Sequence, residues 1–173
     1  MKKLSRLLLV VFFSTILVSG LVFAQEAEMK TYKNEEYGFE VSYPEGWTKT
    51  EMSYKGSGIL SVSAYPDPHN VSVTASELRK DLSLEEYTKA YDLKLDSLVR
   101  YQNVEKRKIG ISGVTAYVRV STVARSGGGT RGKDIYLKQG GILYTLSFST
   151  SVDSYKEVTE KFFDPILDSF ELI

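Results

Sequence analysis

Residues 127–134 read Gly-Gly-Gly-Thr-Arg-Gly-Lys-Asp and have the spacing of a phosphate-binding P-loop, in which Gly, four residues and Gly-Lys follow in order. The next position of a P-loop carries Ser or Thr for magnesium, and this chain has Asp134 there. A P-loop also opens a helix that faces the phosphates, whereas β-branched Ile135 and the Tyr and Leu after it predict a strand. We therefore expect no nucleotide binding, and a flexible hairpin loop over residues 125–132.

Basic residues are concentrated in and next to this predicted loop. Arg125, Arg131 and Lys133 are the basic residues, and no acidic residue occurs from Ala124 to Lys133. On an otherwise acidic domain, such a cluster would dock an anionic partner or a membrane surface. A solvated loop is the alternative, because charged residues are common in loops. We take Arg125, Arg131 and Lys133 as the candidate partner interface.

The only histidine, His69, lies near Asp67 in a proline-flanked loop. A zinc site needs three or four protein ligands, so we expect His69 to be an exposed loop residue and the protein to hold no metal or cofactor. A hydrolase would need His69 as its base with a Ser or Thr nucleophile, but no Gly-x-Ser-x-Gly elbow is present. We therefore expect no enzymatic activity, and a hydrolase that uses His69 is the least favoured alternative.

Composition limits the kind of protein to which these residues belong. The chain has 173 residues, of which 42% are hydrophobic, with 22 basic and 22 acidic residues and no cysteine. That length suits one globular domain and excludes most multi-domain enzymes, and the hydrophobic content excludes wholesale disorder. Without cysteine the chain forms no disulfide, no thiolate metal site and no thiol nucleophile.

The N-terminus has the three parts of a secretory signal peptide. Lys2, Lys3 and Arg6 form a positive start, residues 7–18 are apolar apart from one Ser and one Thr, and residues 22–24 place small side chains at the −3 and −1 positions. This pattern predicts a secreted or periplasmic protein. An uncleaved anchor is the alternative, because residues 7–24 count 18 residues, only slightly fewer than the about 20 that span a bilayer.

Cleavage is predicted between Ala24 and Gln25. Residues 1–24 are then the signal peptide, residues 25–30 a short linker and residues 31–173 a single domain. No cysteine follows the apolar run, so no lipid can be attached there. Loss of the three basic residues of the signal peptide leaves 19 basic and 22 acidic residues, a net charge of −3. This acidic balance speaks against nucleic-acid binding.

Helix and strand patterns alternate along the rest of the chain. Ser83 and Glu86 form an S-x-x-E capping box, and a helix with one apolar face is predicted over residues 83–101. A second helix is predicted from residue 153 or 154, and Pro165 should kink or restart it.

Gly140-Gly141 is typical of a hairpin turn. Strands are predicted over residues 39–43, 59–65, 71–75, 104–111, 114–120, 135–137 and 142–148. Hairpin-type connections favour an antiparallel sheet covered by helices, which is an α+β domain.

Residues 37–47, Tyr-Gly-Phe-Glu-Val-Ser-Tyr-Pro-Glu-Gly-Trp, resemble the opening motif of the PsbP-like family. Residues 83–87, 110–113 and 168–170 resemble the start of its central helix, the turn before its meander and its C-terminal segment. The superfamily groups the PsbP subunit of oxygen-evolving photosystem II, the DcrB-like periplasmic proteins and the Ran-binding protein Mog1. The resemblance implies an α/β/α sandwich, with a central and mostly antiparallel sheet flanked by helices.

The same resemblance implies a non-catalytic accessory role. PsbP helps to retain calcium and chloride in photosystem II, largely through an N-terminal extension that this chain lacks. The Ran role needs a nuclear protein, against which the signal peptide speaks. We therefore expect a secreted or periplasmic binding module that contacts an envelope protein, with peripheral membrane contact also open. A luminal photosystem II accessory protein involved in calcium retention is the alternative.

Overall fold

The computed structural model describes residues 28–54, 56–64, 67–79 and 82–173. The predicted signal peptide and its cleavage site lie outside these residues. The strands of the described part are β1 (Met29–Asn34), β2 (Phe39–Pro44), β3 (Thr48–Tyr54), β4 (Ser57–Ser63), β5 (Asn70–Glu77), β6 (Tyr101–Ile111), β7 (Val114–Arg125), β8 (Gly128–Gln139), β9 (Ile142–Ser151) and β10 (Glu171–Leu172). The helices are α1 (Leu84–Asp96), α2 (Tyr155–Val158), the π-helical turn η1 (Thr159–Phe163) and α3 (Asp164–Asp168).

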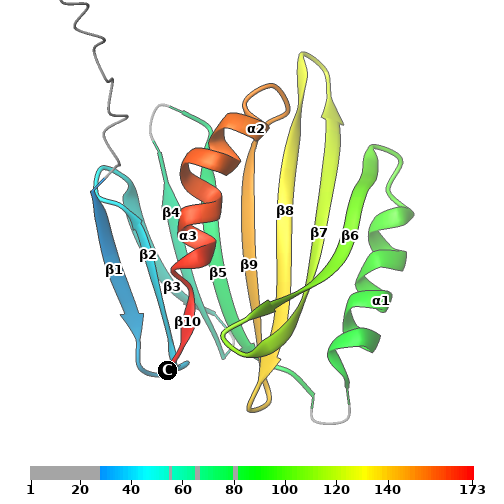
Figure 1. The fold of residues 1–173 in the computed structure, drawn as a ribbon. Coiled ribbons are helices and arrows are strands. Elements are labelled where there is room, and N and C mark those ends of the chain that lie inside the picture. The colour runs from blue at the N-terminus through cyan, green and yellow to red at the C-terminus, as the bar shows by residue number, and fades with distance from the viewer. Residues whose placement is uncertain (1–27, 55, 65–66, 80–81) are drawn as a thin grey trace, which may run out of the picture.

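Two antiparallel sheets make up most of the domain. Seven strands form a large sheet in the order β3-β4-β5-β9-β8-β7-β6, and three form a small sheet in the order β1-β2-β10. Neighbouring strands are antiparallel throughout both sheets. Figure 1 shows the small sheet at the left, α2 and α3 in front of the large sheet, and α1 at the right beside β6.

Tight turns join the strands of the β6–β9 meander. Gly140 and Gly141 connect β8 to β9 with φ angles of 59° and 88°, which confirms the predicted hairpin turn. Ser112 and Gly113 connect β6 to β7 with φ angles of 47° and 78°. Two successive residues at positive φ give the backbone twist that suits a two-residue hairpin. These turns set a register in which alternate residues face opposite sides of the large sheet.

The main hydrophobic core lies on the side of the large sheet that faces α2, η1 and α3. It includes the buried residues Phe39 and Val41 of the small sheet, Phe163 and Ile166 of the C-terminal helical segment, and Phe170. From the large sheet it includes Leu60, Val62, Val71, Val73, Ala116, Val118, Ile135, Leu137, Tyr144, Leu146 and Phe148. The small sheet and the C-terminal helical segment therefore share one face of the large sheet.

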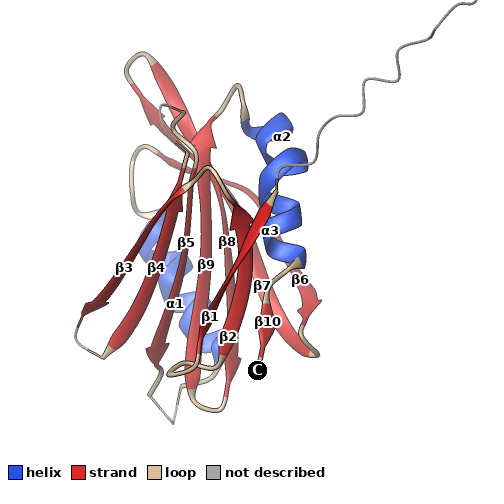
Figure 2. Ribbon diagram, turned by 90° about the vertical axis from the view of Figure 1, so that its left-hand side faces the viewer, coloured by secondary structure: helices blue, strands red, loops and turns tan. Residues whose placement is uncertain are grey.

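Helix α1 covers part of the opposite face. Tyr87 and Tyr91 of α1 pack against Tyr136 and Leu143. In their strands, these two residues are direct neighbours of main-core residues, so their side chains lie on the opposite face of the sheet. Figure 2 shows the strands of the large sheet between α1 on one side and α2 and α3 on the other. The α+β prediction is confirmed, whereas the α/β/α sandwich is confirmed only in part. Strands predominate, and a second sheet occupies much of one helical layer.

The two predicted helices form with different boundaries. Ser83 caps α1 as predicted, because its hydroxyl accepts a hydrogen bond from the backbone N–H of Glu86 at 3.1 Å and Glu86 Oε2 accepts from the N–H of Ser83 at 2.9 Å. The helix ends at Asp96 rather than at residue 101, since Tyr101 already pairs with Val123 in the sheet. The restart at Pro165 is confirmed: the π-helical turn η1 precedes it, and α3 begins at the adjacent residue.

Candidate binding site under helix α1

A row of polar side chains crosses the large sheet on the side of α1. Arg119 of β7 is in register with Asp134 of β8 and with Lys106 of β6, and Asp134 is in register with Ser147 of β9. The Ser147 hydroxyl donates a hydrogen bond of 2.7 Å to Asp134 Oδ1. The antiparallel register thus brings four residues that are distant in sequence into one line across four strands.

The Arg119 guanidinium is the centre of an ion network. Its Nη1 donates to Asp92 Oδ1 of α1 at 2.9 Å, and its Nη2 donates to Asp134 Oδ2 at 3.0 Å and to the Tyr136 hydroxyl. Lys106 Nζ lies 2.7 Å from the other oxygen of Asp92. Only 4% of the Arg119 side chain is exposed. The network therefore ties α1 to β6, β7 and β8 through groups that are largely shielded from water.

Tyrosine rings surround this cation. The ring centroids of Tyr91, Tyr136 and Tyr101 lie 4.9, 5.3 and 5.9 Å from Arg119 Cζ. The ring of Tyr87 stacks on that of Tyr91, with the centroids 6.1 Å apart. A guanidinium within about 6 Å of a ring centroid is attracted to the negative face of the ring. The tyrosines of α1 therefore both pack the helix and stabilise the buried charge.

The network holds its groups in fixed charge states. Burial opposes charge on Arg119, but Tyr136, Asp92 and Asp134 nevertheless raise the pKa of the guanidinium. Burial also opposes charge on Asp92, but hydrogen bonds from Lys106 and Arg119 lower the pKa of this carboxyl. Burial raises the pKa of the Tyr136 hydroxyl, and Asp134 adds to this effect. Arg119 and Asp92 are thus charged and Tyr136 is neutral near pH 7, so the network consists of paired charges.

Two buried polar atoms beside the network have no hydrogen-bond partner among the described residues: Arg119 Nε and Asn103 Oδ1. Asn103 uses its amide nitrogen to donate to Asp96 of α1, which leaves its oxygen free. A buried polar atom without a partner costs about 1–3 kcal/mol, and such atoms mark places where water or a ligand can bind. The junction of α1 with β6 and β7 therefore has unused hydrogen-bonding capacity.

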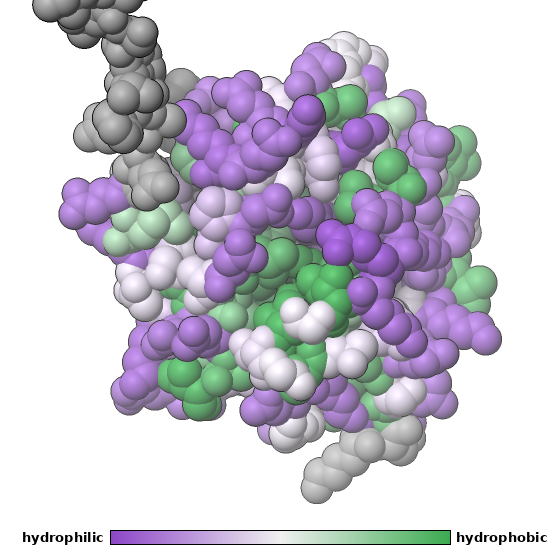
Figure 3. All heavy atoms as spheres, viewed as in Figure 1, coloured by the Kyte–Doolittle hydropathy of each residue, from purple (hydrophilic) through white to green (hydrophobic). Residues whose placement is uncertain are grey.

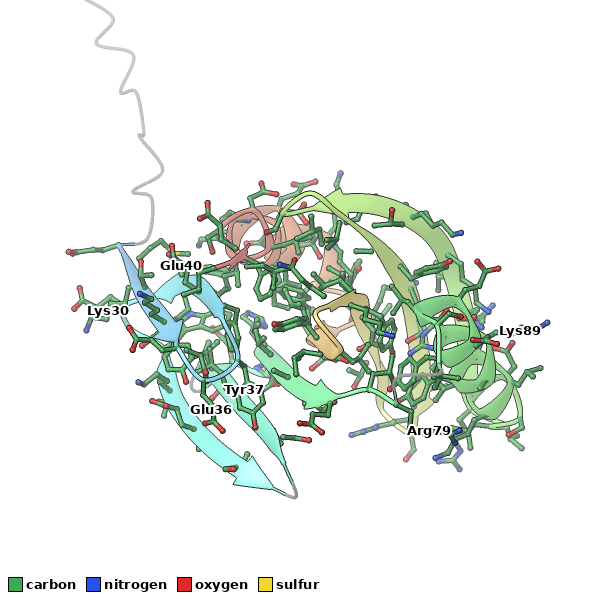
Figure 4. The ribbon with its side chains drawn as sticks, turned by 90° about the horizontal axis from the view of Figure 1, so that it is seen from below. Lys30, Glu36, Tyr37, Glu40, Arg79 and Lys89 are labelled. Carbon is green, nitrogen blue, oxygen red and sulfur yellow. The ribbon has the colours of Figure 1, made fainter. Side chains whose placement is uncertain are left out.

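A cleft of about 470 Å³ opens between α1 and strands β6 and β7. The wall from α1 carries acidic residues, the wall from β6 carries basic residues, and Arg119 and Tyr136 also line the cleft. The charged lining residues are Glu85, Lys89, Asp92 and Asp96 on α1 and Lys106, Arg107 and Lys108 on β6. Leu93 adds an aliphatic side chain that is 68% exposed. Figure 4 shows α1 at one side of the molecule, with Lys89 extending away from the sheet.

The prediction of a loop over residues 125–132 is wrong. Strand β7 continues to Arg125 and β8 starts at Gly128, so only two residues form the turn between them. The other glycines of the P-loop-like segment lie within β8. A Cβ at Gly132 would lie 3.0 Å from the backbone oxygen of Phe148, and a Cβ at Gly129 would lie 3.0 Å from the Val152 side chain. Close strand packing, rather than loop mobility, accounts for these two glycines.

The structure separates the three basic residues of the predicted interface. Arg125 is exposed at the end of β7. Arg131 is half-buried, and its guanidinium lies 5.5 Å from the ring centroid of Tyr155. Lys133 is buried, with its Nζ 2.7 Å from Asp164 Oδ1. Their role as a partner interface stays a prediction, and Arg125 is the one of the three that a partner could readily reach.

The expectation that His69 is exposed is also wrong. His69 is buried at the start of β5, with Nδ1 2.9 Å from Thr150 Oγ1 and its ring centroid 6.2 Å from that of Phe162. Pairing of β5 with β9 carries the preceding residue into the end of the sheet, which the sequence pattern did not reveal.

Among the described residues, no three His, Asp or Glu side chains are grouped to hold a metal ion. No helix in the described ranges is long and apolar enough to cross a membrane.

Sequence reasoning did not single out Arg119. Alternation in β7 assigns Arg119 to the polar side of the strand, where a solvated side chain is the ordinary expectation. The covering helix comes from a different part of the chain, so its return over this face is not visible in the strand pattern. The available signal was the pair Tyr87 and Tyr91 on α1, since aromatic rings often accompany a buried guanidinium.

The chain belongs to the PsbP-like protein family, whose family model matches residues 18–172. This match confirms the resemblance seen in the motif at residues 37–47. No curated protein matches the chain.

Several solved structures share the fold at low sequence identity. Cyanobacterial PsbP (CyanoP) from Synechocystis sp. PCC 6803 is similar with a TM-score of 0.66 and 19% identity, over 90% of this chain and 99% of that chain. LpqN, involved in cell envelope biogenesis of Mycobacterium tuberculosis, is similar with a TM-score of 0.60 and 13% identity, over 84% of this chain and 90% of that chain.

The immunity protein TplEi of the T6SS from Pseudomonas aeruginosa, complexed with "L" peptide, is a third similar structure. Its TM-score is 0.51 at 14% identity, and the match covers 78% of this chain and 49% of that chain. At such identities these likenesses show a common fold.

Proposed function

We propose that the protein is a non-catalytic accessory module that acts outside the cytoplasm, at the cell envelope, by binding a partner protein in the α1 cleft. The observation that carries the proposal is the cleft itself, in which an acidic wall from α1 faces a basic wall from β6. Lys106 and Lys108 pair with Asp92 and Glu85 across the cleft, so a partner would bind by exchanging these ion pairs for contacts with complementary groups of its own. The cleft therefore suits recognition of a polar polypeptide segment.

The position of β6 supports a polypeptide as the bound group. Strand β6 is the last strand of the large sheet, so within the described part of the chain one side of its backbone has no neighbouring strand. An extended segment can add to such an edge by main-chain hydrogen bonds while its side chains enter adjacent pockets. The α1 cleft adjoins this strand, so main-chain and side-chain recognition would be combined in one place.

The similar structures support the same kind of role. TplEi binds a peptide in its complex, a further similar structure is the Tle4–Tli4 complex, and LpqN is involved in cell envelope biogenesis. The signal-peptide pattern of residues 1–24 supports a location outside the cytoplasm. These points favour a partner in the envelope over a cytoplasmic one.

A cross-linking pull-down from envelope extract tests this function. The baits are the secreted protein, a Leu93→Ser/Lys108→Glu variant that alters both walls of the cleft, and a Met52→Ser control. Met52 is 53% exposed on β3, at the opposite edge of the sheet. A partner retained by wild type and control but lost by the cleft variant supports the proposal. Equal capture by all three baits contradicts the cleft as the site, and capture of no protein contradicts partner binding.

The likeness to CyanoP favours one further candidate, a luminal photosynthetic accessory protein involved in calcium retention. Titration of the secreted protein with calcium chloride in a calorimeter tests this alternative. Saturable heat at micromolar calcium would favour it over the envelope module, and absence of heat at millimolar calcium would argue against it.

A further inference from the structure

The connection between α1 and β6 presents two aliphatic side chains to solvent at one end of the molecule. Leu98 is 51% exposed and Val99 is fully exposed, and we term this pair the apolar tip. The backbone turns tightly there, because the N–H of Leu98 donates to the oxygen of Leu95 at 2.9 Å and the N–H of Tyr101 donates to the oxygen of Leu98 at 3.0 Å. Figure 3 shows apolar surface at the margin of the molecule on this side. The apolar tip projects from the domain instead of packing on it.

Three exposed basic residues border the apolar tip, and we term them the basic collar: Lys94, Arg100 and Arg125. Lys94 lies in the last turn of α1, and Arg100 directly follows the tip. The carbonyl of Arg100 accepts a hydrogen bond of 3.0 Å from the N–H of Ala124, which places Arg125 and the β7–β8 hairpin alongside.

The basic collar is not neutralised within the described part of the chain. None of its three members forms an ion pair with a described acidic residue. No Asp or Glu occurs over residues 97–104, nor over residues 106–133. The basic residues of β6, in contrast, are paired with acidic residues, as Lys106 is with Asp92. The free positive charge of this region is therefore concentrated around the apolar tip.

We propose that the apolar tip and the basic collar dock the protein on a membrane surface that carries anionic phospholipid. Aliphatic side chains enter the boundary between headgroups and acyl chains, while the cations meet lipid phosphates. Two aliphatic residues on a projection fall far short of the about 800 Å² that each partner buries in a standard protein interface. A bilayer accepts such a narrow projection, because it deforms around it.

The fold places several segments at the end of the molecule that carries the apolar tip. Strand β1 starts at this end, as Figure 1 shows. A membrane on that side would meet the β7–β8 hairpin and the α1–β6 connection together. The α1 cleft runs along the side of α1 below this end. The protein could therefore contact the membrane and a partner at once, and the membrane contact does not depend on the proposed partner.

Vesicle co-sedimentation tests the proposal with the secreted protein, whose N-terminus is read by mass spectrometry so that all variants are compared in the same form. The vesicles contain phosphatidylcholine alone or phosphatidylcholine mixed with phosphatidylglycerol. Each cation near an anionic surface contributes about fivefold to binding, so Arg100→Ser/Arg125→Ser should lose about 25-fold. Leu98→Ser/Val99→Ser should lose about tenfold or more, because it removes the inserting groups.

Two control variants match these changes at sites away from the apolar tip. Met52→Ser removes an exposed apolar side chain from β3, and Lys33→Ser removes an exposed cation from the far end of β1. Both controls should bind anionic vesicles as the wild type does. Circular dichroism should show the same fold for all variants, because each changed side chain is exposed.

Selective binding of wild type and controls to anionic vesicles, lost in both tip variants, supports the proposal. Equal binding to both kinds of vesicle, or no binding, overturns it, as does a tip variant that binds like the wild type. If the tip variants lose a pulled-down protein while no form of the protein binds vesicles, the tip is a protein interface and the membrane proposal fails. If only the cleft variant loses the partner protein in the pull-down, the interpretation of the vesicle experiment does not change.

Discussion

Arg119 lies on the polar side of β7, yet its surroundings are those of a buried charge. Asp92 and Asp134 balance the guanidinium from two elements, and tyrosine rings fill the space around it. A buried ion pair often adds little net stability, because desolvation offsets the attraction between the charges. Removing one partner is different, since the remaining charges then stay in place without compensation. The residue therefore secures the position of α1 more than it adds to the stability of the core.

Arg119→Ala should lower the free energy of unfolding by about 3 kcal/mol, because it leaves the carboxylate of Asp134 without its cation and that of Asp92 with Lys106 alone. Urea denaturation followed by circular dichroism measures this change. Arg107→Ala is the matched control, since Arg107 pairs with Glu105 at 2.6 Å but is half exposed, and exposed pairs contribute little. Similar losses in the two variants would contradict a special role for the buried network.

Acid should weaken the same network through Asp92. Hydrogen bonds from Lys106 and Arg119 lower the pKa of this carboxyl in the folded state, although burial opposes them. A carboxyl whose pKa is lower in the folded than in the unfolded protein stabilises the fold above its unfolded pKa of about 3.9. That contribution is lost as the pH falls through the lower, folded pKa.

The measurement is the free energy of unfolding as a function of pH for wild type and Asp92→Asn. Asp92→Asn should be less stable at pH 7, and the gap between the two proteins should narrow as the pH falls below about 4. A gap that stays constant over the whole range would show that titration of Asp92 makes no contribution to acid stability.

At the scale of elements, strand β8 shows what a sequence pattern can and cannot provide. The strand character of residues 135–137 and the turn at Gly140-Gly141 could be predicted, because alternation and successive glycines are local signals. The first half of β8 could not, since Gly-Gly-Gly-Thr-Arg-Gly is typical of a loop by composition. Across the sheet, Gly132 faces Phe148 of β9 and Gly129 faces Val152, the residue that follows β9. These contacts cannot be read from the linear sequence. Burial of Lys133 went unpredicted for the same reason, as its partner Asp164 lies in α3.

The steric reading of these glycines can be tested with two substitutions in the same sheet. Gly132→Ala should destabilise the protein by about 1–3 kcal/mol, because the new Cβ would lie 3.0 Å from a backbone oxygen that cannot easily move. A Cβ at Gly110 in β6 would have no heavy atom of the described residues within 4 Å, apart from those of its chain neighbours. Because Gly110→Ala also makes the unfolded chain less flexible, this variant should be as stable as the wild type or slightly more stable. Thermal unfolding of both variants gives the comparison. A neutral Gly132→Ala would mean that this part of β8 tolerates a side chain as a mobile loop does.

At the scale of the whole molecule, the two sides of the large sheet are held in different ways. One side has a continuous core in which residues such as Phe148, Phe163 and Ile166 are almost completely buried. On the other side, the described residues that cover the sheet belong to α1, none of whose residues is buried, and to the connection before it, which contributes Leu78 and Leu82. The candidate cleft and the proposed membrane tip both belong to this less firmly held side. This division would place both proposed surfaces on an element that can adjust while the core stays intact.

Native-state hydrogen exchange should therefore separate α1 from the sheet. Amides of α1 should exchange through a local opening of lower free energy than amides of β8 and β9, because tyrosine packing and ion pairs hold α1 without a buried side chain of its own. Tyr91→Ala should speed exchange in α1 and leave β9 nearly unchanged. Val158→Ala, within the main core, should speed exchange in the elements that open only by global unfolding. Equal protection of α1 and β9 in the wild type would contradict the division, and would tie the cleft to the stability of the whole fold.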